Sequence, residues 1–307
     1  MRWYYHVFGL WLRTNRPIPG IPDLPGGAPI DVEVCLDGIP QEFDPSEKNC
    51  YHLKFEDGIE FVIDQGGTQV WGGGPAQATL EDVAIYLLGF ICAFLLKVRG
   101  IICLHASAVA VGRRVLGLLG TAGTGKSTTA AAFALRGYPV LTDDILALRE
   151  QGDELLVLPG PPRLCLWPNS VDLLYGYAEA LPRLTPESGI DPKWDKRAMD
   201  QAAQGFCFQS EPLPLSAIYL LGEGSPDIAN RVEAMPQGEG LLALLANAKS
   251  DGCYYPVGSR EFAVLGRVAA QVSLRRITRS SDPTYLPNLC DLILEDFQSL
   301  DIVGEKG

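Results

Sequence analysis

The chain has 307 residues, and 47% of them are hydrophobic, which is enough apolar material to fill one large domain or two ordinary ones. Its formal net charge of −12 repels nucleic acids and anionic lipids, so we expect neither a nucleic-acid partner nor a membrane partner. The eight cysteines form no CxxC pair and no spacing typical of zinc sites, which indicates reduced thiols in a cytoplasmic protein.

The N-terminal part of the chain is rich in strand and turn signals. Asp57-Gly58 and Gly66-Gly67 separate three partly alternating segments, which predicts a three-stranded antiparallel meander over residues 50–73. The run Gly72–Pro75 marks its end, so we predict a β-rich N-terminal domain over residues 1–78.

A single apolar helix is expected to follow this domain. Thr79 followed by Asp82 resembles a helix cap, and Gly100 is a typical stop. The apolar run inside it, residues 83–96, is shorter than the roughly 18 residues of a membrane span. The segment therefore predicts a buried helix, and the start of the chain, interrupted by Arg13 and without a small-residue cleavage site, does not resemble a signal peptide.

Residues 101–160 predict a βαβ unit. Two apolar strands are expected over 101–111 and 113–120, a helix over 127–137, a strand over 139–150 and a further strand over 154–160. Beyond this unit we expect helices at 170–181, 239–249, 260–270 and 285–297, strands at 214–222 and 272–277, and a polar segment over 183–209. We assign residues 79–307 to one P-loop domain.

The segment GTAGTGKS at residues 120–127 matches the pattern GxxxxGK[ST] without a mismatch. Its glycines permit backbone angles that turn successive amides inward around phosphate oxygens, and the following helix adds its positive end. A chance match among 33 glycines is the alternative, and the apolar strand before the loop and the Ala-rich helix after it argue against it. The residues expected to bind the nucleotide are Gly120, Thr121, Ala122, Gly123, Thr124, Gly125, Lys126, Ser127 and Thr128.

The acidic pair Asp143-Asp144 follows a short apolar strand, where P-loop proteins commonly place the acid that handles Mg²⁺. Two adjacent carboxylates can divide the work, one holding metal with Ser127 and the other accepting a proton from an attacking hydroxyl. An acidic turn at a strand end is the alternative. His105 stands on the strand before the loop and is available for proton exchange or phosphate contact, or is a packed core residue.

Together these segments resemble the HPr kinase/phosphorylase family, bacterial serine kinases whose P-loop fold is related to phosphoenolpyruvate carboxykinase. His105 lies 21 residues before Lys126 and Asp144 lies 18 residues after it, the spacing of that family's histidine and Asp-Asp pair. The resemblance implies an α/β fold, a mixed sheet with flanking helices, in addition to the β-rich N-terminal domain. It also implies that Asp144 is the general base, that His105 and Lys126 assist at the transferred phosphate, and that Asp143 and Ser127 lie by the metal.

Later segments and the start of the chain look more like the HPr-kinase-like proteins of peptide-biosynthesis clusters, including kinases of lasso-peptide precursors. Ala122 and Thr128 stand where the HPr kinase family usually has Ser and Glu, and its Gly-rich Glu motif has no counterpart in residues 155–168. Its phosphorolysis segment has no match either. The sequence therefore predicts neither reverse phosphorolysis nor HPr as the acceptor.

Basic residues downstream form a second candidate set. Lys193, Lys196 and Arg197 surround Trp194 in a polar segment, and Arg163 follows Pro161-Pro162 on an expected strand. A basic loop folded over the active site can neutralise a transferring phosphate, whereas a solvated charged loop is the alternative.

These patterns predict an ATP- and Mg²⁺-dependent kinase that phosphorylates a serine-type hydroxyl on a peptide or small protein, with a lasso-type precursor peptide as one candidate acceptor. A non-catalytic ATP-binding regulatory protein and a small-molecule or carboxykinase-like kinase are the alternatives. We expect the N-terminal domain to recognise the acceptor. The sequence leaves the oligomeric state open, a homo-oligomer included.

Overall fold

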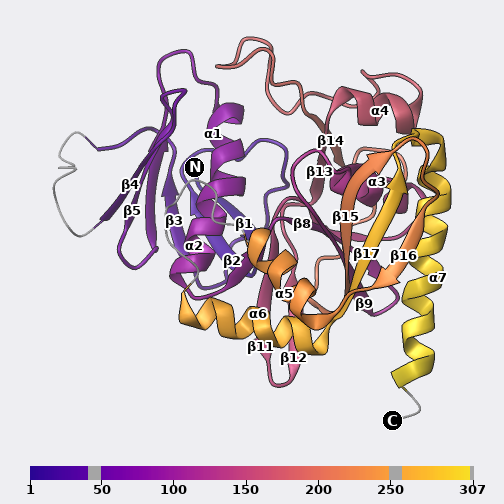
Figure 1. Cartoon of the computed structure of the whole chain (residues 1–307). Coiled ribbons are helices and arrows are strands. Elements are labelled where there is room, and N and C mark those ends of the chain that lie inside the picture. Colours follow the sequence, from indigo (N-terminus) through magenta and orange to yellow (C-terminus); the bar gives the residue numbers. More distant parts are fainter. Residues whose placement is uncertain (41–49, 249–257, 305–307) are drawn as a thin grey trace.

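The computed structural model of the chain describes residues 1–40, 50–248 and 258–304, and shows two large β-sheets joined by a helix, together with a small two-stranded sheet (Figure 1). The end of the predicted helix at 239–249 and Cys253 lie outside these residues. The seven described cysteines are free thiols. Within the described residues, no helix is both long and apolar enough to cross a membrane.

The N-terminal sheet has six strands in the order β1-β2-β3-β6-β5-β4. β4, β5 and β6 pair antiparallel in sequence order, which confirms the meander predicted over residues 50–73. β3 joins this meander to the β1–β2 hairpin through two parallel pairings, one on each side. The strands are β1 (Trp3–Val7), β2 (Leu10–Thr14), β3 (Val32–Cys35), β4 (Cys50–Lys54), β5 (Glu60–Asp64) and β6 (Gln69–Gly73).

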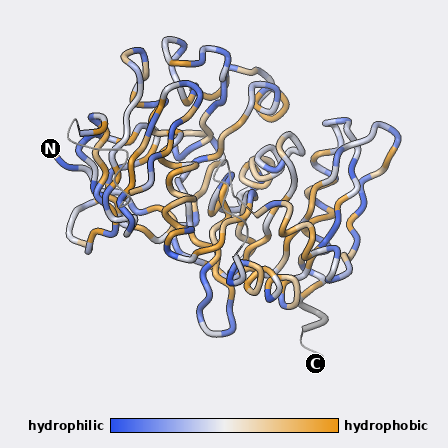
Figure 2. The backbone as a smooth tube through the Cα atoms, turned by 60° about the vertical axis from the view of Figure 1, so that its left-hand side comes forward, coloured by the Kyte–Doolittle hydropathy of each residue, from blue (hydrophilic) through white to orange (hydrophobic). Residues whose placement is uncertain are grey.

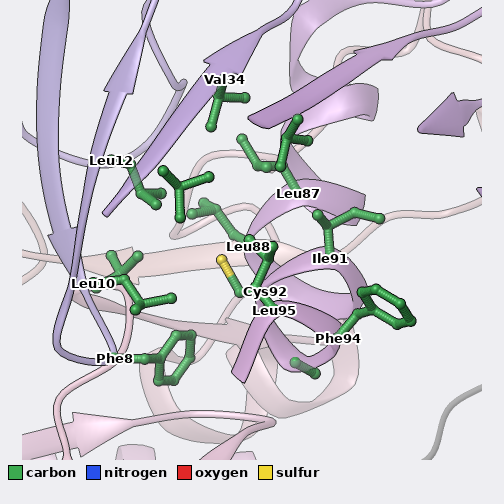
Figure 3. Packing of buried hydrophobic residues seen from close by; sticks show 14 of the residues in the cluster. Phe8, Leu10, Leu12, Val34, Leu87, Leu88, Ile91, Cys92, Phe94 and Leu95 are labelled. Atoms are coloured by element: carbon green, nitrogen blue, oxygen red, sulfur yellow. The ribbon is translucent and has the colours of Figure 1, made fainter. Parts of the chain in front are cut away.

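The helix predicted after residue 79 lies against this sheet (Figure 3). Thr79 caps it through a reciprocal pair of hydrogen bonds with Asp82, and Gly100 follows it with a φ of 72°, so both predicted ends are confirmed. Its fully buried side chains share one apolar cluster with strands of the N-terminal sheet and with Ala147 and Leu158 of the second sheet. The continuous helix consists of α1 (Leu80–Tyr86), a π-helical turn η1 (Leu87–Ile91) and α2 (Cys92–Val98).

The second sheet is mixed and curled. Seven of its strands have the order β10-β8-β9-β15-β12-β11-β7. In addition, β17 pairs with β15, and β16 pairs with β17. β9, β15 and β17 run parallel to one another, and the other pairings are antiparallel. The strands are β7 (Ile102–Leu104), β8 (Ala106–Val111), β9 (Arg114–Leu119), β10 (Val140–Thr142), β11 (Leu146–Gln151), β12 (Glu154–Leu158), β15 (Leu213–Ser225), β16 (Arg231–Ala234) and β17 (Ser273–Ser280).

Two predicted strands are each broken in the structure. The strand expected over 101–111 stops at His105 between β7 and β8, and the one expected over 139–150 stops at residues 143–145 between β10 and β11. The halves pair with one another, β7 with β11 and β8 with β10, so the two breaks lie side by side in the sheet. Asp143-Asp144 was placed directly after a short strand, which the structure confirms, whereas the break at His105 was not predicted because apolar residues continue on both sides of it.

Helices cover both faces of the part of this sheet formed by β9, β15 and β17. Alternate residues of β9 divide between two apolar clusters: Leu116 and Leu118 pack with α3 and α7, and Val115 and Leu119 pack with α5 and α6. Figure 2 shows the matching pattern, with hydrophobic segments inside and hydrophilic turns outside. The helices are α3 (Lys126–Leu135), α4 (Pro168–Tyr175), α5 (Gln237–Ala246), α6 (Ser259–Gln271) and α7 (Leu286–Gly304).

Two helix predictions require correction at their ends. The helix expected over 170–181 ends at Tyr175, because Gly176 adopts a φ of 86° and terminates it. The last helix runs past the predicted end at Phe297 to Gly304. Part of the predicted polar segment 183–209 forms a strand, and the two-stranded sheet there consists of β13 (Arg163–Leu166) and β14 (Arg197–Asp200).

Candidate active site

The loop at residues 120–127 connects the parallel strand β9 to the start of α3. Gly120, Gly123 and Gly125 have φ values of 152°, 82° and 88°, a region that side chains rarely adopt. A Cβ at Gly120 would lie only 2.7 Å from the carbonyl oxygen of Leu221 on β15, so the start of the loop requires glycine. Thr121, Ala122 and Gly123 are exposed, which leaves the loop open to solvent.

Lys126, the first residue of α3, folds its side chain back over the loop. Its Nζ donates hydrogen bonds to the carbonyl oxygens of Gly120 (2.8 Å) and Thr121 (2.9 Å), and only 6% of the residue is exposed. No side chain caps the N-terminus of α3, because its N-cap is Gly125. The loop therefore combines a helix N-terminus with a buried ammonium group, the two features that favour phosphate.

Asp143 directly follows β10 and is held by three hydrogen bonds. Its Oδ1 accepts from Ser127 Oγ (2.8 Å) and Ser107 Oγ (2.7 Å), and its Oδ2 accepts from the amide of Cys165 (2.9 Å). The residue is 8% exposed. Ser107 was not predicted as a site residue, although its place two residues after His105 puts it beside the pairing of β8 with β10.

The side chains of Asp144 and His105 meet at the two strand breaks. The distance between His105 Nε2 and Asp144 Oδ1 is 3.0 Å, and the side chains are 28% and 47% exposed. Asp144 has a φ of 69°, which turns its side chain away from the direction of a regular strand. Such a conformation at a non-glycine residue is energetically costly, and it is found preferentially at functional sites.

The four basic residues predicted as phosphate or substrate contacts take different positions. Arg163 is buried, and its Nη1 donates to the carbonyl of Pro19 (3.3 Å) in the N-terminal part of the chain. Arg197 pairs with Asp195 and also donates to the carbonyl of Leu181. In the described part of the chain, neither guanidinium has a hydrogen bond or ion pair with residues 120–127, so both have structural partners.

Lys196 is linked to α3 through a chain of contacts that passes through Trp167 and α4. Its Nζ is 5.5 Å from the ring centre of Trp167 and 5.8 Å from that of Trp194, distances typical of cation–π contacts. Trp167 precedes α4, and Ser170 of α4 shares a 2.7 Å hydrogen bond with Thr128 of α3. The remaining basic residue, Lys193, is exposed.

Arg279 on β17 is a site residue that the sequence analysis missed. One of its guanidinium nitrogens lies 4.0 Å from the position that a Cβ at Gly125 would occupy. No local motif identifies this arginine, because it reaches the loop only through the parallel order of β9, β15 and β17.

The chain was compared with known proteins. No family model matches it, and no curated protein matches it either. Among solved structures it is similar to the Hpr(Ser) kinase/phosphatase from Coxiella burnetii, at 10% sequence identity and a TM-score of 0.33. The alignment covers 66% of this chain and 95% of that one. At this TM-score and identity, the similarity does not establish a common fold or activity, so function has to be inferred from the site residues.

Proposed function

We propose that the chain is an ATP- and Mg²⁺-dependent kinase that transfers the γ-phosphate to a serine-type hydroxyl of a peptide or small protein. The observation that carries this proposal is the different environment of two adjacent carboxylates. Asp143 is buried and bonded to Ser127 of the loop, whereas Asp144 is half-exposed and paired with His105.

The residues present fit a magnesium–nucleotide complex. Mg²⁺ in kinase and ATPase sites is bound by one or two carboxylates together with water and substrate phosphates. Among the described residues, no group of three or more His, Cys, Asp or Glu side chains is placed to hold a metal ion. Ser127 and Asp143 would hold the ion, which would neutralise charge on the transferring phosphate.

The roles of the remaining residues follow from their exposure. Asp144 accepts the proton of the acceptor hydroxyl as the acceptor oxygen forms its bond to the γ-phosphorus. The bond from that phosphorus to the bridging oxygen breaks, and ADP leaves. Lys126 and the loop amides hold the phosphates, and His105 keeps the Asp144 carboxylate in place through the 3.0 Å contact of its Nε2 with Oδ1.

A peptide acceptor is supported by the open side of the site. Asp144 is 47% exposed, so an acceptor hydroxyl can reach it, and Trp167, at the start of α4, is an exposed aromatic side chain (45%). A lasso-type precursor peptide remains the candidate suggested by the sequence resemblance. The N-terminal sheet is the proposed recognition element for the acceptor.

A regulatory protein that binds ATP without transferring phosphate is the second candidate function. One observation favours it: residues 155–168 contain no Asp or Glu, so the segment after β11 supplies no additional metal-binding acid.

Incubation with γ-labelled ATP and candidate peptides separates the two functions. We expect label on a peptide serine with the wild-type chain, no transfer with Lys126→Ala, and retained nucleotide binding with transfer reduced by roughly 10²–10⁴-fold with Asp144→Asn. Asp153→Asn, in an exposed turn away from the loop, is the matched control. Nucleotide binding without transfer to any peptide would favour the regulatory protein, and normal transfer by Asp144→Asn would exclude Asp144 as the base.

A further inference from the structure

Arg279 lies near the C-terminal end of β17, at the edge of the sheet where the loop begins. β9, β15 and β17 are parallel and adjacent, so their C-terminal ends lie at one edge. The Nε of Arg279 donates to the carbonyl of Gly222 on the neighbouring strand β15 (3.2 Å), and its Nη1 donates to the carbonyl of Ser280 (3.5 Å). Main-chain oxygens thus fix the direction of the guanidinium group.

The remaining nitrogen of this guanidinium group points at the loop. Nη2 lies 4.0 Å from the position of a Cβ at Gly125, the residue that precedes α3. Within residues 1–40, 50–248 and 258–304, Nη2 makes no hydrogen bond. An arginine presents a planar fork of donors, and here one arm is held by the protein while the other faces the loop.

The charge of Arg279 is poorly compensated where it lies. Burial lowers the pKa of this guanidinium group, and none of the described residues forms an ion pair with it. Its neighbours on β17 differ, since Arg275 pairs with Asp296 and Arg276 pairs with Glu239. A cation is also unfavourable beside a helix N-terminus, where the helix dipole is positive.

An anion placed between Arg279, Lys126 and the loop amides would remove this imbalance. We propose that Arg279 binds the polyphosphate of the nucleotide, as a phosphate-binding residue in addition to those of the loop. The proposal rests on the proposed nucleotide-binding function of the loop. Guanidinium groups match phosphate oxygens through paired, charge-assisted hydrogen bonds, which a lysine does not reproduce.

Binding measurements with three ligands test this role: MgADP, MgGDP and magnesium tripolyphosphate, each titrated calorimetrically. Arg279→Gln should weaken all three by about 10- to 100-fold, because a hydrogen bond to a charged group is lost. Arg279→Lys should recover part of the loss. Arg276→Gln, an exposed and ion-paired position on the same strand, is the matched control and should bind all three ligands normally.

The melting temperature of the ligand-free protein separates ligand binding from a structural role. Because no described residue forms an ion pair with Arg279, Arg279→Gln should leave that temperature unchanged or raise it. A marked fall in both the Gln and the Lys variants would assign Arg279 a structural role and overturn the proposal.

Three further results would also overturn it. Unchanged affinity of Arg279→Gln for all three ligands would remove Arg279 from the site while leaving the proposed function intact. Loss of MgADP affinity with normal tripolyphosphate binding would place Arg279 at the nucleoside instead. Failure of the wild-type chain to bind any of the ligands would overturn the proposed function itself, and this proposal with it.

Discussion

At the scale of single residues, the site depends on two neighbouring side chains that differ in burial and in hydrogen-bond partners. Asp143 and Asp144 are adjacent in sequence, yet one is buried among three donors and the other faces solvent beside His105. The sequence shows the pair and its spacing from Lys126, whereas the different environments of the two carboxylates depend on the left-handed conformation of Asp144.

Ser107 should support the position of Asp143. Ser107→Ala removes a 2.7 Å hydrogen bond from a buried carboxylate, so we expect the free energy of unfolding to fall by about 1–2 kcal/mol. Nucleotide binding should also require a higher magnesium concentration, since Asp143 loses one of its hydrogen-bond donors. Urea unfolding and a magnesium titration measure the two effects.

The matched control for Ser107→Ala is Ser299→Ala, because Ser299 is an exposed serine near the C-terminal end of α7, bonded to the carbonyl of Asp296. It should change neither quantity appreciably. A Ser107→Ala protein with wild-type stability and wild-type magnesium dependence would show that Asp143 is held by Ser127 and the main chain alone.

The structural partners of the basic residues could not be predicted from the sequence. Lys193, Lys196 and Arg197 were grouped because their charges are adjacent along the chain. In the structure the partners differ: two tryptophan rings for Lys196 and Asp195 for Arg197. Contacts made only in the fold, such as that of Lys196 with Trp167 and that of Arg163 with the carbonyl of Pro19, decide the role of each basic side chain.

At the scale of elements, local signals predicted most helices and strands of the described residues. Caps and glycine stops mark the helix at 80–98, and turn pairs mark the meander over 50–73. The break at His105 was missed because both of its sides are apolar, whereas the acidic pair Asp143-Asp144 correctly marks the end of β10 in the sequence. The two breaks bring the proposed catalytic pair together, and that pairing depends on how β7, β8, β10 and β11 lie in the sheet.

The turn between β5 and β6 gives a pH-dependent prediction. Burial raises the pKa of Asp64, but hydrogen bonds from the amides of Gln69 and Thr68 and from the Thr68 hydroxyl outweigh it and hold the pKa below its usual value. A lowered pKa contributes stability above the ordinary Asp pKa of about 3.9, and that contribution is lost as the pH falls through the folded-state pKa.

Asp64→Asn should therefore lower the free energy of unfolding at pH 6, and the difference from the wild-type chain should shrink as the pH falls below about 4. Urea unfolding across this range measures it. Asp153→Asn, in the exposed β11–β12 turn, should show no such difference. A gap between Asp64→Asn and wild type that stays constant down to pH 3 would contradict the assignment.

At the scale of the whole molecule, the N-terminal sheet and the second sheet share an apolar cluster. Leu87, Ile91 and Leu95 of the connecting helix are fully buried in that cluster, which includes residues of both sheets (Figure 3). The proposed recognition role of residues 1–78 therefore concerns their function and does not require that they fold independently. Removal of these residues would expose the side of the connecting helix that they cover.

Expression of residues 79–307 alone should give a protein that aggregates or binds a hydrophobic dye, because this apolar helix face would meet water. The whole chain should unfold in one cooperative transition on heating, since the shared core couples the two sheets. A soluble, well-folded 79–307 fragment, or two well-separated transitions in the whole chain, would show that the sheets are energetically independent.

The central claim is that the loop at residues 120–127 holds nucleotide phosphates. A crystal structure with Mg²⁺ and a nonhydrolysable ATP analogue tests it most directly. We predict the phosphates within the loop, with Lys126 Nζ turned from the carbonyls of Gly120 and Thr121 toward them and the metal beside Ser127 and Asp143. A crystal grown at a saturating concentration of the analogue would contradict the account if the analogue lay elsewhere and Lys126 were still hydrogen-bonded to those carbonyls.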